Sequence, residues 1–396
     1  MKKIFFLFLL LFTFYTVKTQ TYDSLRVSLL TVEPHSKAVW TIFGHTALRL
    51  YDPVLKIDEV YNWGTFDFEA PNFIMNFVKG KTDYFLSTSD FQSVMRHHYY
   101  EGATVTEQTL NISDDQKAAL LNFLRNNLLP ENRGYRYSFI FDNCTTRPRD
   151  IIEQFCGGTL IYPEQKEKTT FRQLIHLCAE SYPWTKFGID CVIGSGADSL
   201  ISYRYELFLP EKLMDALDRS VVKNQDGSER LVVLRSELIL KSLKPNKSSE
   251  QDSLLINFFN TPFAVGLTLF SLYLFLVILS FFFKNRFSVP FALLFFIAGA
   301  GGCIVAFLNF FSLHPCVQLN WNLIWLHPLH FIACVGFFLK KHYKLIYWYH
   351  TINFLLLSVF LLVWNWVTQE LNMAFIPLIL CLCIVSGSQV LKLKQK

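Results

Sequence analysis

Acidic residues are almost absent from the last third of this 396-residue sequence, where Glu370 is the only one from position 261 onward. Cysteine is absent from the first hundred residues, so we do not expect the protein itself to be a lipoprotein. The sequence also contains no HExxH or CxxC pattern, no internal repeat and no low-complexity tract. The missing metal patterns argue against a zinc enzyme.

Apolar residues make up 52% of the chain, including 40 Phe, which is too much for one soluble domain. They gather at the two ends. Lys2 and Lys3 are followed by an uncharged run from Ile4 to Val17, which is typical of a secretory signal peptide over residues 1–20. Cleavage is expected near Thr19 or Gln20, with a retained short anchor as the alternative.

Long uncharged stretches after residue 260 predict a membrane domain. The uncharged stretches are 261–283, 287–339, 345–369 and 371–391. Crossing ~30 Å of hydrocarbon takes ~20 residues, so these stretches can hold one, two, one and one helices, respectively. The second stretch is expected to turn back between Leu313 and Asn322. The sequence therefore predicts an all-α domain of five transmembrane helices over 261–391, with residues 392–396 as a tail.

The basic residues of this region indicate its orientation. Eight Lys and Arg occur after residue 260, in three groups that fall on one side of a five-helix arrangement: Lys284 and Arg286; Lys340, Lys341 and Lys344; Lys392, Lys394 and Lys396. The positive-inside rule makes that side cytoplasmic. We therefore predict a multi-pass protein of the bacterial inner membrane, with residues 21–260 in the periplasm and a cytoplasmic C-terminus. Residues 21–260 carry 26 Lys and Arg against 31 Asp and Glu, which argues against a nucleic-acid partner.

Residues 21–220 alternate strand-like and helix-like patterns, which predicts an α+β periplasmic domain. Strands are expected from Val39 and from Glu59, with their turn over 52–58, and again over 135–141. Ser113 and Gln116 form a capping box for a helix that stops at Pro130. Residues 221–260 are expected to hold a hairpin around Asp226 and Gly227, followed by a polar linker from Lys244.

Cys144 is the predicted nucleophile. Asn143 is a good N-cap residue and Pro148 suits a first helical turn, so Cys144 is expected at the start of a helix that ends at Gly157 and Gly158. Unpaired backbone N–H groups at that end, with Arg147 and Arg149 one turn on, favour the thiolate and can also stabilise an oxyanion. The alternative for a single cysteine is a buried structural role.

His45 is the predicted general base, because it follows Gly44 at the start of an alternating strand and can face a helix packed on the sheet. Asn62, on the next strand, is the predicted third member that orients the imidazole. His97 and His98 are adjacent and would point opposite ways on a strand, so we expect no metal site. The outer domain contains three other cysteines: Cys156, Cys178 and Cys191. If Cys144 is free, these three can form at most one disulfide, and the sequence does not choose the pair.

The chain resembles a known family in several blocks: FGHTALRL, YNWGTFDF, YSFIFDNCTTRPRD, KFGIDCVIGSGAD, FLPEKLMDAL and, in the membrane part, NWNLIWLHPLH. A histidine on an early strand and a cysteine at a later helix start resemble circularly permuted papain-like enzymes related to NlpC/P60. The blocks resemble more closely the Lnb-type lipoprotein N-acyltransferases of Bacteroidota. The sequence departs from that pattern at His327 and His330, where the membrane motif of the family carries Asn.

This resemblance implies transfer of an acyl chain from a membrane phospholipid to the α-amino group of a diacylglyceryl-cysteine lipoprotein, with Cys144 as nucleophile and His45 as base. No cofactor is expected, because an ester already activates the acyl group and the periplasm supplies no nucleotide. Predicted substrate contacts are Tyr137, Asn143 and Arg147 near the thiol, and Asn320, Trp321 and Asn322 in the outer turn of the membrane domain. Two alternatives stay open: a membrane-anchored cysteine hydrolase of phospholipid or peptidoglycan peptides, and a catalytically silent domain of the same fold.

Overall fold

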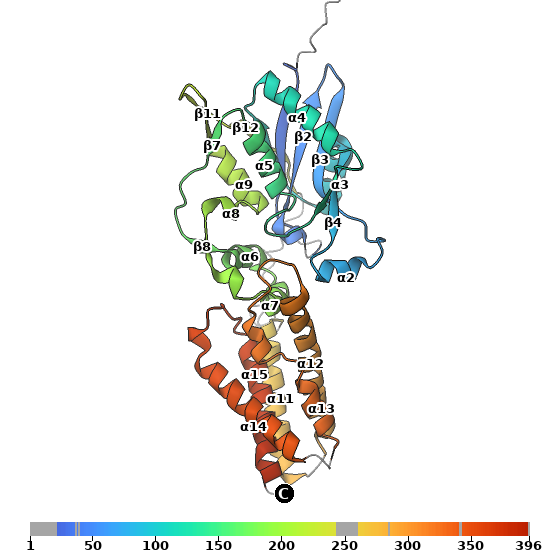
Figure 1. Cartoon of the computed structure of the whole chain (residues 1–396), viewed down its shortest axis with the longest axis vertical. Coiled ribbons are helices and arrows are strands. Elements are labelled where there is room, and N and C mark those ends of the chain that lie inside the picture. The colour runs from blue at the N-terminus through green and yellow to red at the C-terminus, as the bar shows by residue number, and fades with distance from the viewer. Residues whose placement is uncertain are drawn as a thin grey trace, which may run out of the picture.

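The computed structural model describes residues 22–35, 38, 40–242, 260–283, 286–339 and 343–394. An outer domain stands on a bundle of long helices, and the two are stacked along the longest axis (Figure 1). The expected signal peptide at 1–20 and the expected linker from Lys244 lie outside the described residues. The α+β domain followed by a helical domain confirms the fold class expected from the sequence.

One antiparallel sheet of seven strands forms the centre of the outer domain. Its strand order is β12 (Val233–Leu240), β5 (Val105–Leu110), β1 (Arg26–Val32), β2 (His45–Asp52), β3 (Ile57–Thr65), β4 (Asp83–Asp90) and β6 (Gly134–Arg136). Six of the seven residues of β1 are buried, because helices cover both faces of the sheet at its middle. The strands expected from Val39 and Glu59 correspond to β2 and β3, and a turn joins them over 53–56.

Helices α4 (Asp114–Asn127), α5 (Thr146–Phe155) and α9 (Pro210–Asp218) pack on one face of the sheet, and α3 (Phe91–Glu101) packs on the other (Figure 1). The expected capping box of Ser113 and Gln116 is present at the start of α4. Burial of each large apolar side chain stabilises this arrangement by roughly 1.5–3 kcal/mol. The main core contains Tyr61, Trp63, Leu86, Leu120, Leu121, Leu124, Ile151, Ile152, Leu213 and Leu217.

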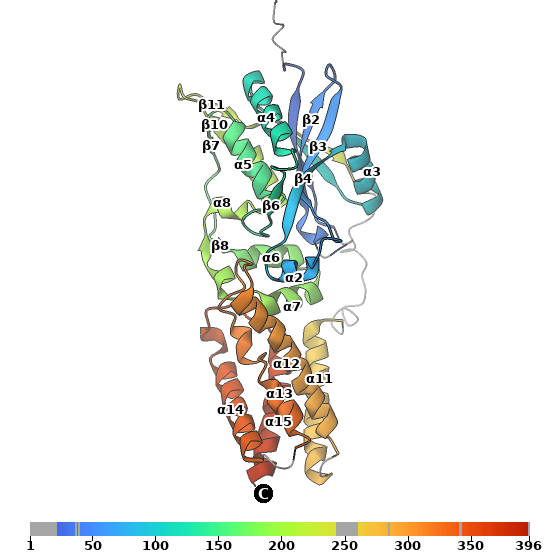
Figure 2. The same ribbon diagram turned by 45° about the vertical axis from the view of Figure 1, so that its right-hand side comes forward.

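Shorter elements complete the outer domain. They are the 3-10 turns η1 (Thr41–Phe43) and η2 (Ser195–Asp198), the helices α2 (Phe73–Val78), α6 (Phe171–Ala179), α7 (Pro183–Val192) and α8 (Tyr203–Glu206), and two small sheets, β11 (Glu229–Leu231) with β10 (Val221–Lys223) and β7 (Thr159–Ile161), and β8 (Thr169–Thr170) with β9 (Leu200–Ile201). Figure 2 shows α2 and α7 between the sheet and the helical bundle.

Two boundaries differ from those expected. The outer domain extends to residue 242 and does not end at 220, because β12 pairs with β5 along the edge of the main sheet and the β10–β11 hairpin pairs with β7. The strand expected over 135–141 is limited to β6. Beyond Arg136 the chain leaves the sheet and closes a turn in which Ser138 and Asp142 exchange backbone hydrogen bonds.

Four helices of the described chain are long and apolar enough to cross a membrane: α11 (Pro262–Phe282), α12 (Ser288–Phe311), α14 (Tyr343–Leu362) and α15 (Phe375–Lys394). The fifth expected helix is interrupted. Its segment forms a 3-10 turn, η4 (Trp321–Ile324), then the short helix α13 (His330–Gly336) packed along α12. Pro328 cannot donate a backbone hydrogen bond, and the Asn322 side chain accepts from the Trp325 indole, so a continuous helix does not form here. A further 3-10 turn, η5 (Trp364–Trp366), follows α14.

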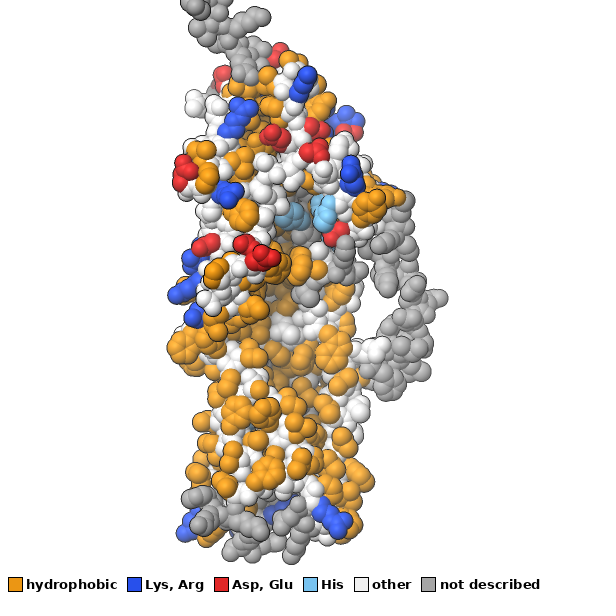
Figure 3. All heavy atoms as spheres, turned by 90° about the vertical axis from the view of Figure 1, so that its right-hand side faces the viewer, with side chains coloured by type: hydrophobic (Ala, Val, Ile, Leu, Met, Phe, Trp, Pro, Cys, Tyr) orange, Lys and Arg blue, Asp and Glu red, His pale blue; other side chains and the backbone are white. Residues whose placement is uncertain are grey.

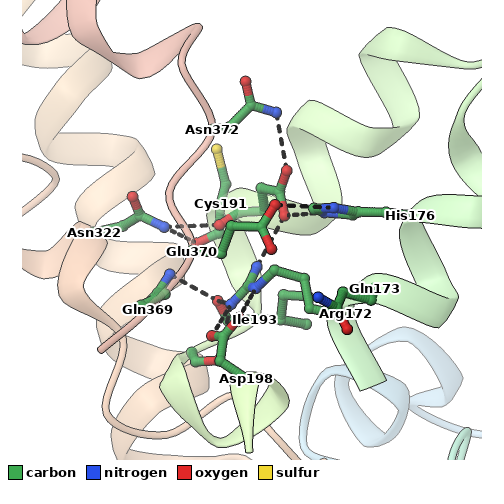
Figure 4. A network of polar contacts seen from close by, with 12 residues as sticks. Arg172, Gln173, His176, Cys191, Ile193, Asp198, Asn322, Gln369, Glu370 and Asn372 are labelled. Atoms are coloured by element: carbon green, nitrogen blue, oxygen red, sulfur yellow. Dashed lines mark hydrogen bonds and ion pairs between the residues drawn. The ribbon is translucent and has the colours of Figure 1, made fainter. Parts of the chain in front are cut away.

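A buried polar network joins the two domains (Figure 4). Arg172 of α6 is fully buried and donates to Asp198 at 2.7 Å and to Asp190 of α7 at 2.9 Å. From the bundle side, the Asn372 amide donates to Asp190 at 2.9 Å. The Gln369 amide donates to the Ile193 carbonyl at 3.1 Å. The network fixes how the outer domain sits on the helices.

The Arg172→Met variant tests this network. Removal of the guanidinium leaves the buried Asp190 with His176 as its remaining cationic partner and leaves Asp198 unpaired, so we expect a loss of about 3 kcal/mol in the free energy of unfolding. Thermal unfolding of the purified protein measures it. The control is Arg136→Met, because Arg136 pairs with Asp83 at the surface, where an ion pair contributes about 1 kcal/mol or less. Equal shifts in the two variants would contradict the role assigned to the network.

Candidate active site

Three side chains that are distant in the sequence meet at one point of the sheet. His45 is the first residue of β2, Asn62 lies in β3, and Cys144 lies two residues before α5. The His45 Nε2 atom is 2.7 Å from the Asn62 Oδ1 atom. Because a carbonyl oxygen only accepts, Nε2 carries the proton in this contact, and Nδ1 is left to face the thiol.

Gly64 lies at the centre of this group. A Cβ built on Gly64 would be 3.2 Å from His45 Cε1, 3.5 Å from Asn62 Oδ1 and 3.7 Å from Cys144 Cβ. The strands β2 and β3 pair with Leu48 opposite Tyr61, and an extension of that register places Gly64 opposite His45. Asn62 is then a diagonal neighbour on the same face, which is why the two side chains meet.

Asn143 fixes the backbone around the thiol. Its Oδ1 atom accepts from the backbone N–H groups of Thr145 and Thr146, both at 2.8 Å, so it caps the start of α5 as the sequence predicts. Its amide donates to the carbonyls of Phe139 and Phe208. The polar atoms of its side chain are therefore engaged within the protein. We expected Asn143 to contact the substrate, but these hydrogen bonds give it the role of positioning Cys144.

The electrostatics of Cys144 and His45 favour an ion pair. Burial raises the pKa of the Cys144 thiol, but the charge of His45 and hydrogen bonds from His45, Thr145 and the Thr46 backbone outweigh burial, so the pKa is lowered. Burial also lowers the pKa of His45. The charge of Cys144 and the hydrogen bonds to Cys144 and Asn62 outweigh burial, so the pKa of His45 is raised. Both shifts stabilise a thiolate next to an imidazolium.

The two arginines expected to support the thiolate have other partners. Arg147 donates to both carboxylate oxygens of Asp142, at 2.6 and 2.8 Å, and its guanidinium lies 3.7 Å from the centroid of the Tyr135 ring. Arg149 donates to Asp150 at 2.8 Å. Both arginines are thus paired with neighbouring carboxylates, and neither is among the groups that lower the pKa of Cys144. A substrate contact by Arg147 stays a prediction.

The group of His45, Asn62 and Cys144 opens into a cavity of about 950 Å³. Most of its lining is apolar or aromatic, including Phe43, Phe66, Phe68, Phe73, Phe77, Tyr84, Tyr137, Phe139 and Phe208. Tyr137 lines it as expected and stacks on Tyr84, with ring centroids 4.1 Å apart. His314 of the membrane domain also lines it, so the cavity extends to the level of the bundle. Figure 3 shows histidine side chains in a hollow on the outer domain, above a broad hydrophobic surface that continues down the bundle.

The expected headgroup contacts in the membrane domain lie elsewhere. Asn320 and Asn322 are buried, and their amides donate to the carbonyls of Cys191 and Asp190 in α7 (Figure 4). The Trp321 backbone N–H donates to the Gln369 side chain at 2.9 Å. These residues hold the two domains together and do not line the cavity. The burial of Asn320 and Asn322 leaves their amides no room for a headgroup, whereas a contact by the partly exposed Trp321 stays a prediction.

His97, His98 and Glu101 lie at one side of the same cavity, with a ligand atom of each within 4.8 Å of the others. We expected no metal site because we placed the two histidines on a strand; they lie in α3, where neighbouring side chains are about 100° apart. Burial, followed by the charges of His45 and His97, lowers the pKa of His98 to about 4, so its ring is neutral, as a metal ligand must be. These residue types could hold a transition-metal ion.

All nine cysteines are free thiols, so the one disulfide that the outer domain could form is not made. Cys156 is buried. Burial raises the pKa of Cys178 to about 11 and that of Cys191 to about 12, with smaller contributions from nearby acidic groups. The pKa of Cys144 is lowered, in contrast to those of Cys178 and Cys191.

The Gly64→Ala variant tests the geometry around the thiol. The new methyl group would stand 3.2 Å from His45 Cε1, closer than carbon atoms normally pack, so the imidazole must shift away from Cys144 and Asn62. We expect a fall of about tenfold or more in the rate of Cys144 alkylation by a small thiol reagent near neutral pH. The control is Gly188→Ala in α7, where an added Cβ meets nothing within 4 Å. Unchanged alkylation in Gly64→Ala would contradict the described packing.

Sequence reasoning missed the aromatic side of the cavity and its contact with the bundle. The segment from Phe66 to Phe77 contains four Phe, one Ile and one Met, and such a density of large apolar residues outside the core is a signal that could have been used. Thr46 and Thr145, which hydrogen-bond near the sulfur, carry no comparable signal, because threonine is common in strands and at helix starts.

Comparisons with known families cover both domains. The model described as the Lnb N-terminal periplasmic domain matches residues 13–176, which include His45, Asn62 and Cys144. The model described as the Lnb transmembrane domain matches residues 253–396, which include all helices from α11 to α15. No curated protein and no solved structure matches the chain.

Proposed function

Because the chain belongs to the Lnb family of lipoprotein N-acyltransferases, we propose that it moves an acyl chain from a membrane phospholipid, through a thioester on Cys144, to the α-amino group of a diacylglyceryl-cysteine lipoprotein. The periplasmic domain and the transmembrane helices make it an inner-membrane protein. The observation that carries the proposal is a thiol, an imidazole and a carboxamide that meet in an apolar cavity extending to the membrane domain.

In the first step, the Cys144 thiolate attacks the carbonyl carbon of a phospholipid ester. A carbon–sulfur bond forms, and the oxyanion is stabilised by nearby N–H groups. Within the described chain, no group accepts a hydrogen bond from the Cys144 backbone N–H, so this donor is available. The carbon–oxygen bond then breaks, His45 gives its proton to the departing alkoxide, and a lysophospholipid leaves.

In the second step, the lipoprotein amine attacks the thioester carbonyl while His45, now neutral, takes a proton from the nitrogen. The carbon–sulfur bond breaks, which gives the amide and restores the thiolate and imidazolium. Ester to thioester to amide needs no other energy source, which suits a compartment without nucleotides. Asn62 holds the imidazole orientation through both steps, because its Oδ1 atom accepts from Nε2.

The apolar lining bears on the alternative of a cysteine hydrolase. A peptidoglycan peptide is polar and charged, and its burial in this cavity would cost hydrogen bonds that the aromatic walls do not return. A phospholipid hydrolase would use the same cavity with water as acceptor. The two enzymes differ in the fate of the acyl chain: an amide on the acceptor peptide or a free fatty acid.

The topology proposal places the base of the bundle in the cytoplasm. Figure 3 shows Lys and Arg side chains at that end of the molecule, opposite the outer domain. Within the part of the membrane domain that the structure describes, the basic residues are Arg286, Lys344, Lys392 and Lys394. Positive residues at one end of the helices favour a cytoplasmic C-terminus and a periplasmic cavity.

The test uses purified protein in nanodiscs that contain phospholipid with an isotope-labelled acyl chain, with a diacylated lipopeptide as acceptor. The proposal predicts labelled triacylated peptide and lysophospholipid in equal amounts. Labelled free fatty acid in place of the amide would show a hydrolase. Absence of both products would contradict either enzyme.

A further inference from the structure

The short helix α2 (Phe73–Val78) rests on the loop that directly follows α12. The Ser312 hydroxyl donates to the Val78 carbonyl at 2.8 Å, and the His314 ring donates to the Phe77 carbonyl at 2.6 Å. The Leu313 backbone N–H donates to the Lys79 carbonyl at 2.9 Å. Because α12 ends at Phe311, these contacts hold α2 at the outer end of a membrane span (Figure 2).

The outward side of α2 is apolar and uncovered. Ile74 is 77% exposed, Met75 and Phe77 are also exposed, and the helix contains no charged residue. On the bundle side of the contact, Phe310 and Phe311 are each 69% exposed. The apolar surface of a membrane span thus continues onto the outer domain at α2. A surface of this kind is stable in hydrocarbon or the interfacial region of a bilayer and costly in water.

The inward side of α2 leads to the thiol through a row of aromatic rings. Neighbouring ring centroids along it are 4.1 to 6.4 Å apart. The pairs are, in order, Phe77–His314, Phe73–Phe77, Phe66–Phe73, Phe66–Tyr84 and Tyr84–Tyr137. All of these side chains line the cavity that also contains Cys144. The row therefore connects the uncovered surface of α2 with the nucleophile.

We propose that α2 inserts into the outer leaflet of the inner membrane and forms the entrance through which the acyl chain of a bilayer lipid slides into the cavity. The inference rests on the proposed function for its substrate, and it adds the route. Exposed Ile74 and Met75 anchor the entrance among lipid chains, and the aromatic rings of Phe66, Phe73 and Phe77 form a wall along which the chain runs. The ester carbonyl at the end of the chain then reaches Cys144 without passage through water.

The entrance is tested first by contact with lipid, with no need for catalysis. A benzophenone amino acid replaces Ile74 in the Cys144→Ala protein, and illumination in nanodiscs is followed by detection of cross-linked phospholipid. The control carries the same photoprobe at Val54, which is equally exposed but lies in the turn between β2 and β3, at the end of the sheet remote from the bundle (Figure 1). We expect lipid adducts at position 74 and none at 54. No adduct at 74, or equal adducts at both positions, would overturn the inference.

The entrance is tested second by its effect on lipid use. The double variant Ile74→Asp with Met75→Asp introduces charge into the proposed interfacial surface, and we expect acylation of Cys144 from bilayer phospholipid to fall by at least about tenfold. Alkylation of the thiol by a small soluble reagent should stay within about twofold, because His45 and Asn62 are untouched. The control is Val54→Asp with Leu231→Asp, at two exposed apolar positions away from the bundle.

The two tests separate the entrance from the proposed function. Lipid adducts at position 74 together with absent acyl transfer in the unmodified protein would support the entrance and contradict the transferase. Normal phospholipid use by the Ile74→Asp, Met75→Asp protein would overturn the entrance and leave the transferase intact. Equal losses in this variant and its control would also overturn it, because the effect would then follow from added charge anywhere on the outer domain.

Discussion

Cells that carry only the Cys144→Ala variant are expected to make diacylated lipoproteins in place of triacylated ones. The side chain supplies the nucleophile, and removal of a catalytic nucleophile lowers turnover by at least about 10³-fold. The substitution removes one sulfur atom from a half-buried position and leaves the hydrogen bonds of Asn143 in place, so the protein should still reach the membrane. Mass spectrometry of a lipoprotein N-terminal peptide measures the result, and immunoblotting of membranes confirms the amount of protein.

The matched control is Cys178→Ala. Cys178 is another free thiol of the outer domain, and burial raises its pKa to about 11, so it is protonated near neutral pH. Triacylated peptide at the normal level is expected from this variant. Normal triacylation with Cys144→Ala would end the proposal of a thioester on this residue, whereas equal losses in both variants would point to a defect in folding.

The His45→Ala variant is expected to have the second-largest effect. It removes the base and the charge that lowers the pKa of Cys144, so acyl transfer should fall by roughly 10² to 10⁴-fold. The same change exposes the electrostatic role of His45 in a simpler measurement. The pH at which Cys144 reacts half-maximally with a small alkylating reagent should rise, because the charge and the hydrogen bond of His45 no longer oppose the effect of burial on the thiol.

The pH profile of the unmodified protein follows from the same shifts. The active pair is thiolate with imidazolium, which exists above the lowered pKa of Cys144 and below the raised pKa of His45. Transfer from phospholipid to Cys144 should therefore be bell-shaped, falling on the acid side as the sulfur is protonated and on the alkaline side as the ring loses its proton. A profile that only rises with pH would contradict the ion pair.

The local geometry of the thiol could be predicted because its causes are local. His45 and Asn62 lie on consecutive antiparallel strands joined by a tight turn, and the alternation of each strand fixes which side chains share a face. Asn143 caps a helix start whose pattern is present in the sequence. His45 and Asn62 come close to Cys144 because α5 packs over the sheet, and the apolar pattern of α5 favours this packing.

The contacts between the two domains could not be predicted, because they depend on how one folded surface fits another. Asn320 and Asn322 lie in a polar outer turn, and nothing in their sequence distinguishes a headgroup contact from hydrogen bonds to α7. The charge of Arg147 was assigned to the thiol because it is near in sequence, but Asp142 is nearer in space. For His97 and His98 the sequence does carry a helical signal, because Phe91, Val94 and Met95 have the i, i+3, i+4 spacing of one helix face.

The central claim is that one ionised sulfur accepts an acyl chain directly from a membrane lipid. Purified protein in nanodiscs, without an acceptor peptide, should gain the mass of one acyl chain, and peptide mapping after rapid acid quench should place it on Cys144 alone among the nine cysteines. Addition of diacylated lipopeptide should remove that mass at the rate at which the amide forms. An acyl chain on another residue, or amide formed while Cys144 stays unmodified, would contradict the account.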